Sequence, residues 1–84
     1  MQITLKLYAS LTGMLPAGSD KHAARINIPA NATVHTIVDQ FNVPRPMAHL
    51  VLLNGIYLHP EERDQHNKLK DGDTLAIWPP VAGG

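Results

Sequence analysis

The last seven residues of the chain are the part whose residue types could do chemistry. They are an aromatic residue, two prolines, two small apolar residues and two glycines: Trp78, Pro79, Pro80, Val81, Ala82, Gly83 and Gly84. Because the prolines lack amide donors and hold φ at about −65°, a strand must end there and the chain must leave it extended. Glycine has no side chain, so a narrow channel in another protein could admit Gly83 and Gly84 and bring a terminal carboxylate to reactive groups. The alternative is that the two glycines are a frayed end.

The composition narrows the other kinds of chemistry. The 84 residues include no cysteine, which excludes disulfides, thiolate metal sites, a catalytic thiol and a side-chain thioester or persulfide. Sulfur or acyl chemistry must therefore use another group. Seven basic and seven acidic residues cancel, so we expect neither nucleic acid nor a membrane as partner. No apolar run is long enough to span a bilayer, and we expect a cytoplasmic protein.

Scattered titratable residues offer two weaker candidates for a site. No two histidines have the His-x-His or His-x-x-x-His spacing of a metal site, and we expect no metal. The five histidines are His22, His35, His49, His59 and His66. Glu61, Glu62 and Asp64 could be paired carboxylates for acid–base catalysis, but a solvated face explains them better in so short a chain. We therefore expect no catalytic residues of its own.

Charge is unevenly distributed along the chain. Residues 1–60 carry four basic and two acidic side chains, and residues 61–84 carry three basic and five acidic ones, which gives +2 and −2. An acidic neighbourhood around the tail would steer it towards a basic partner surface.

The elements that position the tail follow from hydrophobic periodicity. Alternating apolar residues predict strands over 2–7 and 24–28, and the intervening 9–20 reads as a loop that could contain one turn of helix. Leu11 and Leu15 would pin this loop to the core.

A helix is predicted between residues 33 and 41, with Thr33 or Asn31 as its cap. Its apolar residues fall at i, i+3, i+4 and i+7: Val34, Ile37, Val38 and Phe41. Pro44 and Pro46 prevent its continuation.

The remaining elements are shorter. The apolar run 50–53 reads as a strand buried on both faces, although a helical turn is not excluded. Asn54-Gly55 is a tight-turn pair before a short return strand over 56–58. A turn at 70–73 precedes the last strand, 74–78.

The order hairpin, helix, strand, short strand, final strand is that of an α+β, ubiquitin-like β-grasp domain. We expect a mixed sheet of four to five strands with one main helix packed across it. Residues 1–78 would form the domain and residues 79–84 an extended, flexible carrier tail.

Three segments resemble the MoaD/ThiS family of sulfur carriers: Leu53-Asn54-Gly55, residues 69–73 and residues 78–84. The similarity covers nearly the whole chain, and the ending is closest to the small subunit of molybdopterin synthase. In that family a ubiquitin-activating-type adenylyltransferase uses ATP to adenylate the terminal glycine. Sulfur from a cysteine desulfurase or rhodanese-type donor then replaces AMP to give a thiocarboxylate.

The resemblance implies a role for each tail residue. Gly84 would carry the adenylate and then the sulfur, while the residues before it would enter the partner: Pro80, Val81, Ala82 and Gly83. Trp78 either covers the sheet edge or anchors a partner. The protein would be a co-substrate with no permanently bound cofactor, and it could dock to a large synthase subunit.

Several alternatives remain open at this stage. The carrier could serve molybdopterin, thiazole, cysteine or tRNA thiolation. The same activated glycine could instead form isopeptide bonds to lysines, as in a ubiquitin-like modifier. A non-catalytic ubiquitin-like binding module with an inert tail is the third possibility.

Overall fold

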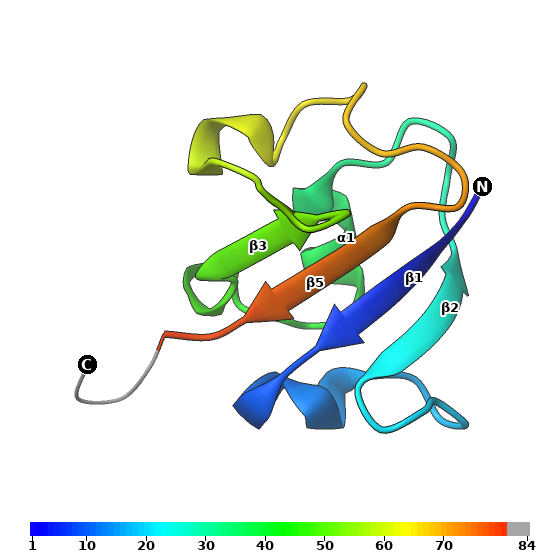
Figure 1. Cartoon of the computed structure of the whole chain (residues 1–84), viewed down its shortest axis with the longest axis vertical. Helices are drawn as coiled ribbons and strands as arrows, with labels where there is room; N and C mark the ends of the chain where they lie inside the picture. Colours follow the sequence, from blue (N-terminus) through cyan, green and yellow to red (C-terminus); the bar gives the residue numbers. More distant parts are fainter. Residues whose placement is uncertain (81–84) are drawn as a thin grey trace.

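A computed structural model gives the structure of this protein and describes residues 1–80. One mixed sheet of five strands, in the order β2-β1-β5-β3-β4, carries helix α1 on one face (Figure 1). The strands are β1 Gln2–Leu7, β2 Ala23–Asn27, β3 Leu50–Leu53, β4 Ile56–Tyr57 and β5 Thr74–Trp78. The helix is α1 Val34–Gln40, and the three 3-10 turns are η1 Ala9–Met14, η2 Arg45–Met47 and η3 Pro60–Glu62. The predicted ubiquitin-like β-grasp fold is confirmed.

The central pair of the sheet is β1 and β5, which run parallel with Leu5 opposite Leu75 and Leu7 opposite Ile77. All four side chains are fully buried, because alternation places them on the face that α1 covers. Parallel pairing also brings the end of β5 beside the end of β1. The root of the tail therefore lies next to the first residues of η1.

Helix α1 forms for the reasons that the sequence gives. Thr33 is its cap: the Thr33 Oγ1 atom accepts from the Thr36 amide at 3.0 Å, and the Thr33 amide donates back to Thr36 Oγ1 at 3.3 Å. Val34, Ile37 and Val38 are buried against the sheet, and Phe41 packs on the same core while half-buried.

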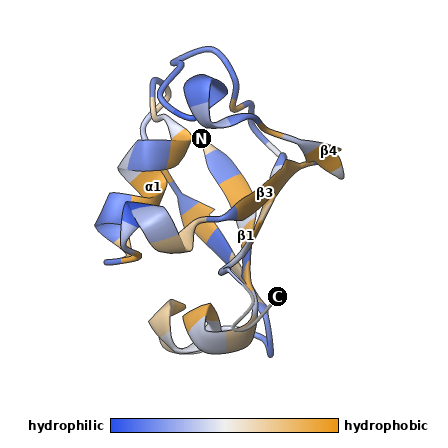
Figure 2. Cartoon of the chain, turned by 90° about the vertical axis from the view of Figure 1, so that its left-hand side faces the viewer, coloured by the Kyte–Doolittle hydropathy of each residue, from blue (hydrophilic) through white to orange (hydrophobic). Residues whose placement is uncertain are grey.

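The expectation that β3 is buried on both faces is wrong. Val51 is fully buried, but Leu50 is 38% exposed and Leu52 is only half-buried. The single helix α1 lies on one side of the sheet, which Figure 2 shows from the edge. The face turned away from α1, here called the open face, has no covering layer in the described part of the chain.

Two turns contain glycine residues whose backbone has positive φ. Asn54 and Gly55 both have positive φ, +51° and +83°, as a type I′ hairpin between β3 and β4 requires. At the start of β5, Asp71 Oδ1 accepts from the Gln2 amide at 2.8 Å beside Gly72, whose φ is +87°.

Within residues 1–80, no helix has both the length and the apolar character needed to cross a bilayer. The same residues bring no three histidine or acidic side chains together in a metal-binding arrangement.

Candidate functional site

The tail root is held by hydrogen bonds on both sides of β5. The Tyr8 amide donates to the Ile77 carbonyl at 3.2 Å, and the His49 amide donates to the Trp78 carbonyl at 3.1 Å. Pro79 is buried and Pro80 is exposed, so the chain passes from the body to the surface between the two prolines. The remaining predicted tail residues, Val81, Ala82, Gly83 and Gly84, lie outside the described residues.

An aromatic stack fixes Trp78 at this point. The Trp78 and Tyr8 rings are almost parallel, at 2° and 4.3 Å between centroids, and His22 stacks on the other side of Tyr8 at 5.0 Å and 25°. Stacked rings of this kind stabilise each other beyond the area they bury. Trp78 is half-buried, so it covers the end of the sheet and still presents part of its ring to the surface.

An apolar groove of about 420 Å³ borders the same ring. We call it the tail-root groove. Its lining residues come from the start of η1, the start of β3 and the tail root: Ala9, Ser10, His49, Leu50, Trp78, Pro79 and Pro80. The groove therefore lies directly beside the point at which the chain leaves the body, since Pro79 and Pro80 line it.

The open face continues the groove across the sheet. Register places Leu52 between Ala76 and Tyr57, and Leu50 opposite Trp78. Tyr57 and Leu50 are 41% and 38% exposed. Exposed apolar side chains gathered in this way mark an interaction surface more often than isolated ones do.

Cations accompany the apolar part of the open face. Lys6 on β1 lies opposite Ala76 on β5. Arg25 on β2 lies opposite Thr4 on β1. The Arg25 guanidinium donates to Gln2 Oε1 at 2.9 Å. None of the strand residues on this face is acidic.

The expected acidic neighbourhood is wrong for the tail root. Asp71 and Asp73 precede β5, so they lie a whole strand, about 17 Å, away from its tail end. Asp73 accepts from the Lys70 amide at 2.8 Å and from Asn54 Nδ2 at 2.9 Å, which commits its carboxylate to the turn. Among the described residues, none that line the tail-root groove is acidic. The charge count along the sequence failed because it ignored the direction of β5.

Two of the other acidic side chains, those of Glu62 and Asp39, have structural partners. Glu62 pairs with Lys68 at 2.7 Å and accepts from the His59 amide at 3.0 Å. The Lys68 hydrogen bond, followed by that of the His59 amide, lowers the pKa of the Glu62 carboxyl. Asp39 accepts two hydrogen bonds from Arg45, which lowers the pKa of Asp39. A lowered carboxyl pKa favours the charged acceptor, the opposite of what a general acid needs.

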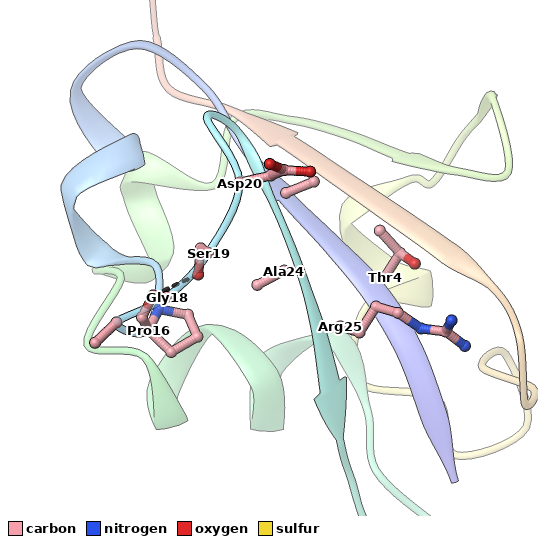
Figure 3. Close-up of a pocket in the computed structure, with 9 residues that line it drawn as sticks. Thr4, Pro16, Gly18, Ser19, Asp20, Ala24 and Arg25 are labelled. Atoms are coloured by element: carbon pink, nitrogen blue, oxygen red, sulfur yellow. Dashed lines mark hydrogen bonds between the residues drawn. The ribbon is translucent and has the colours of Figure 1, made fainter.

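A second hollow, of about 480 Å³, lies at the outer edge of β2 (Figure 3). Its wall is the segment 16–20, where the Ser19 hydroxyl donates to the Pro16 carbonyl, and its floor includes Ala24. Asp20 and Arg25 are the charged residues of its lining, which contains no histidine and no carboxylate pair. This hollow offers no set of catalytic groups and shares no residue with the tail root.

Sequence reasoning drew attention to the tail, but it did not find the residues that surround the tail root. No sequence pattern singled out Tyr8, and His22 and His49 stood out only as two of five scattered histidines. The signal was available in part, since parallel pairing of the first and last strands already places Tyr8 beside Trp78.

Comparison with known proteins agrees with this geometry. The ThiS family model matches residues 17–84. SAMP1 of Haloferax volcanii is 26% identical, with both chains fully covered and a TM-score of 0.65. No curated protein matches the chain.

Two further solved structures share the fold. A putative molybdopterin converting factor subunit 1 of Pyrococcus furiosus is 21% identical over 95% of this chain and 98% of its own, with a TM-score of 0.63. A chain from the complex of subunits 1 and 2 of the molybdopterin-converting factor of Helicobacter pylori 26695 is 18% identical, covers both chains fully and has a TM-score of 0.55. Since the family model spans most of the sequence, the chain belongs to the ThiS family of small ubiquitin-like carrier and modifier proteins.

Proposed function

We propose that this protein is a sulfur carrier whose Gly84 carboxylate is adenylated and then converted to a thiocarboxylate. The supporting observation is the tail root: a ThiS-family chain leaves a clamped β5 through Pro79 and Pro80, beside an apolar groove and an uncovered sheet face. The body is thereby rigid where a partner docks, and the chain leaves it at Pro79 and Pro80. With no cysteine in the chain, the terminal carboxylate is the group left for sulfur.

The chemistry takes two balanced steps. A Gly84 carboxylate oxygen attacks the α-phosphorus of ATP, and pyrophosphate leaves. Hydrogen sulfide, or an equivalent sulfur nucleophile, then attacks the acyl carbon; AMP leaves, and a proton is released as the thiocarboxylate forms. A free carboxylate resists nucleophiles, so AMP as a leaving group is what makes the second step possible. An adenylyltransferase of the ubiquitin-activating type would catalyse the first step, and we expect this ATP-consuming reaction in the cytoplasm.

The open face and the tail-root groove would dock on that adenylyltransferase. Pro80, Val81, Ala82 and Gly83 would then enter its channel, and Trp78 would stand at the channel mouth. Lys6 and Arg25 flank the apolar part of the face. The matching partner surface is therefore apolar with an acidic margin.

Molybdopterin synthesis is the recipient pathway that we favour. The proposal draws on the fold shared with the putative molybdopterin converting factor subunit 1 and with a chain of the complex of subunits 1 and 2. A large synthase subunit would then receive the thiocarboxylate by the same tail insertion.

Intact-mass analysis tests the carrier chemistry directly. The untagged protein is incubated with ATP, sulfide and its cognate adenylyltransferase, and we expect a mass gain of one oxygen-to-sulfur replacement that disappears without ATP. Deletion of Gly84 should abolish the gain. Gly13→Ala is the matched control, because a Cβ at Gly13 meets nothing within 4 Å. A tail that never gains sulfur under these conditions would refute the proposal.

A protein modifier is the second candidate, favoured by the 26% identity to SAMP1. It uses the same adenylate but transfers the Gly84 acyl group to a lysine amine. Lysine peptides linked to Gly84, recovered from cells that express the untagged chain, would support it. If Gly84 deletion changes neither sulfur transfer nor conjugation, the chain is a binding module with an inert tail.

A further inference from the structure

We infer that Arg63 is a positioning residue for the tail, acting through the main chain of His49. The consequence of this inference rests on the proposed carrier function, whereas its mechanism rests on the hydrogen bonds of the folded body. Arg63 follows η3 in a segment whose sequence is typical of a charged, solvated surface. Arg63 is nevertheless only 7% exposed. No carboxylate pairs with it in residues 1–80.

Main-chain carbonyls take the place of a counter-ion. Arg63 Nε and Nη2 donate to the Leu58 carbonyl at 3.1 and 3.0 Å, and Nη1 donates to the Ala48 carbonyl at 2.7 Å. Nη2 also reaches the His49 carbonyl at 3.2 Å, and the Tyr57 ring lies 5.9 Å from the guanidinium carbon. The Arg63 guanidinium thus links the residue that follows β4 to the two residues that precede β3.

His49 transmits this anchoring to the tail root. Its carbonyl accepts from Arg63, and its amide donates to the Trp78 carbonyl at 3.1 Å. That bond is the last contact of the β3 side with β5 before Pro79. His49 and Leu50 also form one wall of the tail-root groove, so Arg63 fixes both the exit of the tail and the shape of the groove beside it.

On the other side of β5, the Tyr8 amide donates to the Ile77 carbonyl, so it cannot replace the hydrogen bond from His49 to Trp78. If the start of β3 shifts, the Trp78 carbonyl loses its donor, and Pro79 has no amide through which to re-form a contact. The direction of the tail would then vary from molecule to molecule. Insertion into a narrow channel would lose the advantage of a preset exit.

A guanidinium is needed for this role because it presents several donors in a fixed plane. Lysine keeps the charge but concentrates its donors on one compact ammonium group. Arg63→Lys therefore leaves carbonyls of the Ala48–His49 segment without donors while preserving charge and most of the side-chain volume. Arg63→Met removes the charge as well as the donors. Comparison with Arg63→Lys therefore separates the effect of the charge from the effect of the donors.

The experiment compares these variants with a control of equal stability. Ile3 is buried at the start of β1, at the opposite end of the sheet from the tail. Ile3→Val or Ile3→Ala is chosen to match the loss of stability in the Arg63 variants. Amide hydrogen exchange at His49, measured by NMR relative to the slowest-exchanging amides, reports the His49–Trp78 bond without any partner.

We expect the His49 amide of Arg63→Lys to exchange about tenfold faster relative to the core, and kcat/KM for sulfur loading of Gly84 to fall about tenfold. The Ile3 control should change neither ratio. Equal behaviour of Arg63→Lys and the Ile3 control would overturn the inference, since Arg63 would then act only on stability. If the parent protein never accepts sulfur, the proposed function fails, and the His49 exchange ratio still decides the role of Arg63.

Discussion

Two neighbouring residues of β3 separate the buried face of the sheet from the open one. Val51 is fully buried opposite Ile77, and Leu50 is 38% exposed opposite Trp78. Replacing each by lysine places the same charge one residue apart on opposite faces. The two variants therefore test the assignment of the faces and the role of the open face in docking.

The expected costs in folding free energy differ several-fold. At roughly 0.05–0.15 kcal/mol per residue, an 84-residue domain has about 4–13 kcal/mol of stability. An unpaired ammonium at Val51 would cost about 3–5 kcal/mol, which is comparable with the lower end of this range, and the buried valine contacts would be lost as well. At Leu50 the lysine stem would lie over the sheet with its ammonium in water, and about 1 kcal/mol of apolar burial would be lost.

Thermal unfolding followed by circular dichroism measures the first effect. Leu50→Lys should unfold cooperatively with a Tm about 4–8 °C lower, whereas Val51→Lys should be largely unfolded at room temperature. The second effect is measured as kcat/KM for sulfur loading of Gly84. Docking would bury the new ammonium against an apolar partner surface, so we expect Leu50→Lys to lose at least about tenfold.

A charge on the helix side serves as the control. Gln40 is exposed at the end of α1, so Gln40→Lys should retain both the Tm and kcat/KM. If Leu50→Lys unfolds as completely as Val51→Lys, the assignment of Leu50 to an uncovered face of the sheet is wrong. A folded Leu50→Lys variant that accepts sulfur at the parental rate would show that the tail is recognised without this face.

Three smaller effects can be measured on the isolated protein. Thr33→Ala removes the cap of α1 and should cost about 1 kcal/mol in urea unfolding; an unchanged midpoint would argue against the cap. A double-mutant cycle on Tyr8→Leu and Trp78→Leu should give a coupling of about 0.5–1.5 kcal/mol, and additive losses would mean that the stack adds nothing. Glu62 has a lowered pKa because Lys68 donates to it, so its stabilising effect is complete above the ordinary glutamate pKa of about 4.3 and is lost as the pH falls through the lowered value. Glu62→Gln should flatten the acid limb of the stability curve, and an unaltered limb would contradict the assignment.

Local pattern was sufficient for most of the fold. Alternation in residues 2–7 predicted β1, and the 3.6-residue spacing in α1 predicted both the helix and its buried side. Asn54 and Gly55 predicted the hairpin turn. These features depend on neighbours within a few residues, so the sequence contains all of the information that they need.

The burial of β3 could not be predicted in the same way. Four consecutive apolar residues are typical of a strand covered on both faces, but the number of covering layers depends on the rest of the chain. A single helix covers one face here. Leu50 is consequently exposed, and it lines the tail-root groove and is not part of the core.

The sequence by itself determined that two prolines and a diglycine follow the final strand, and that the 84 residues include no cysteine. Only the tertiary structure decided what surrounds the root. Tyr8 meets Trp78 through parallel pairing across nearly the whole chain length, and Arg63 reaches the carbonyls of residues 14 and 15 positions before it. Such contacts follow from strand register and side-chain reach, which no local pattern encodes, and they set the direction in which the tail leaves the body.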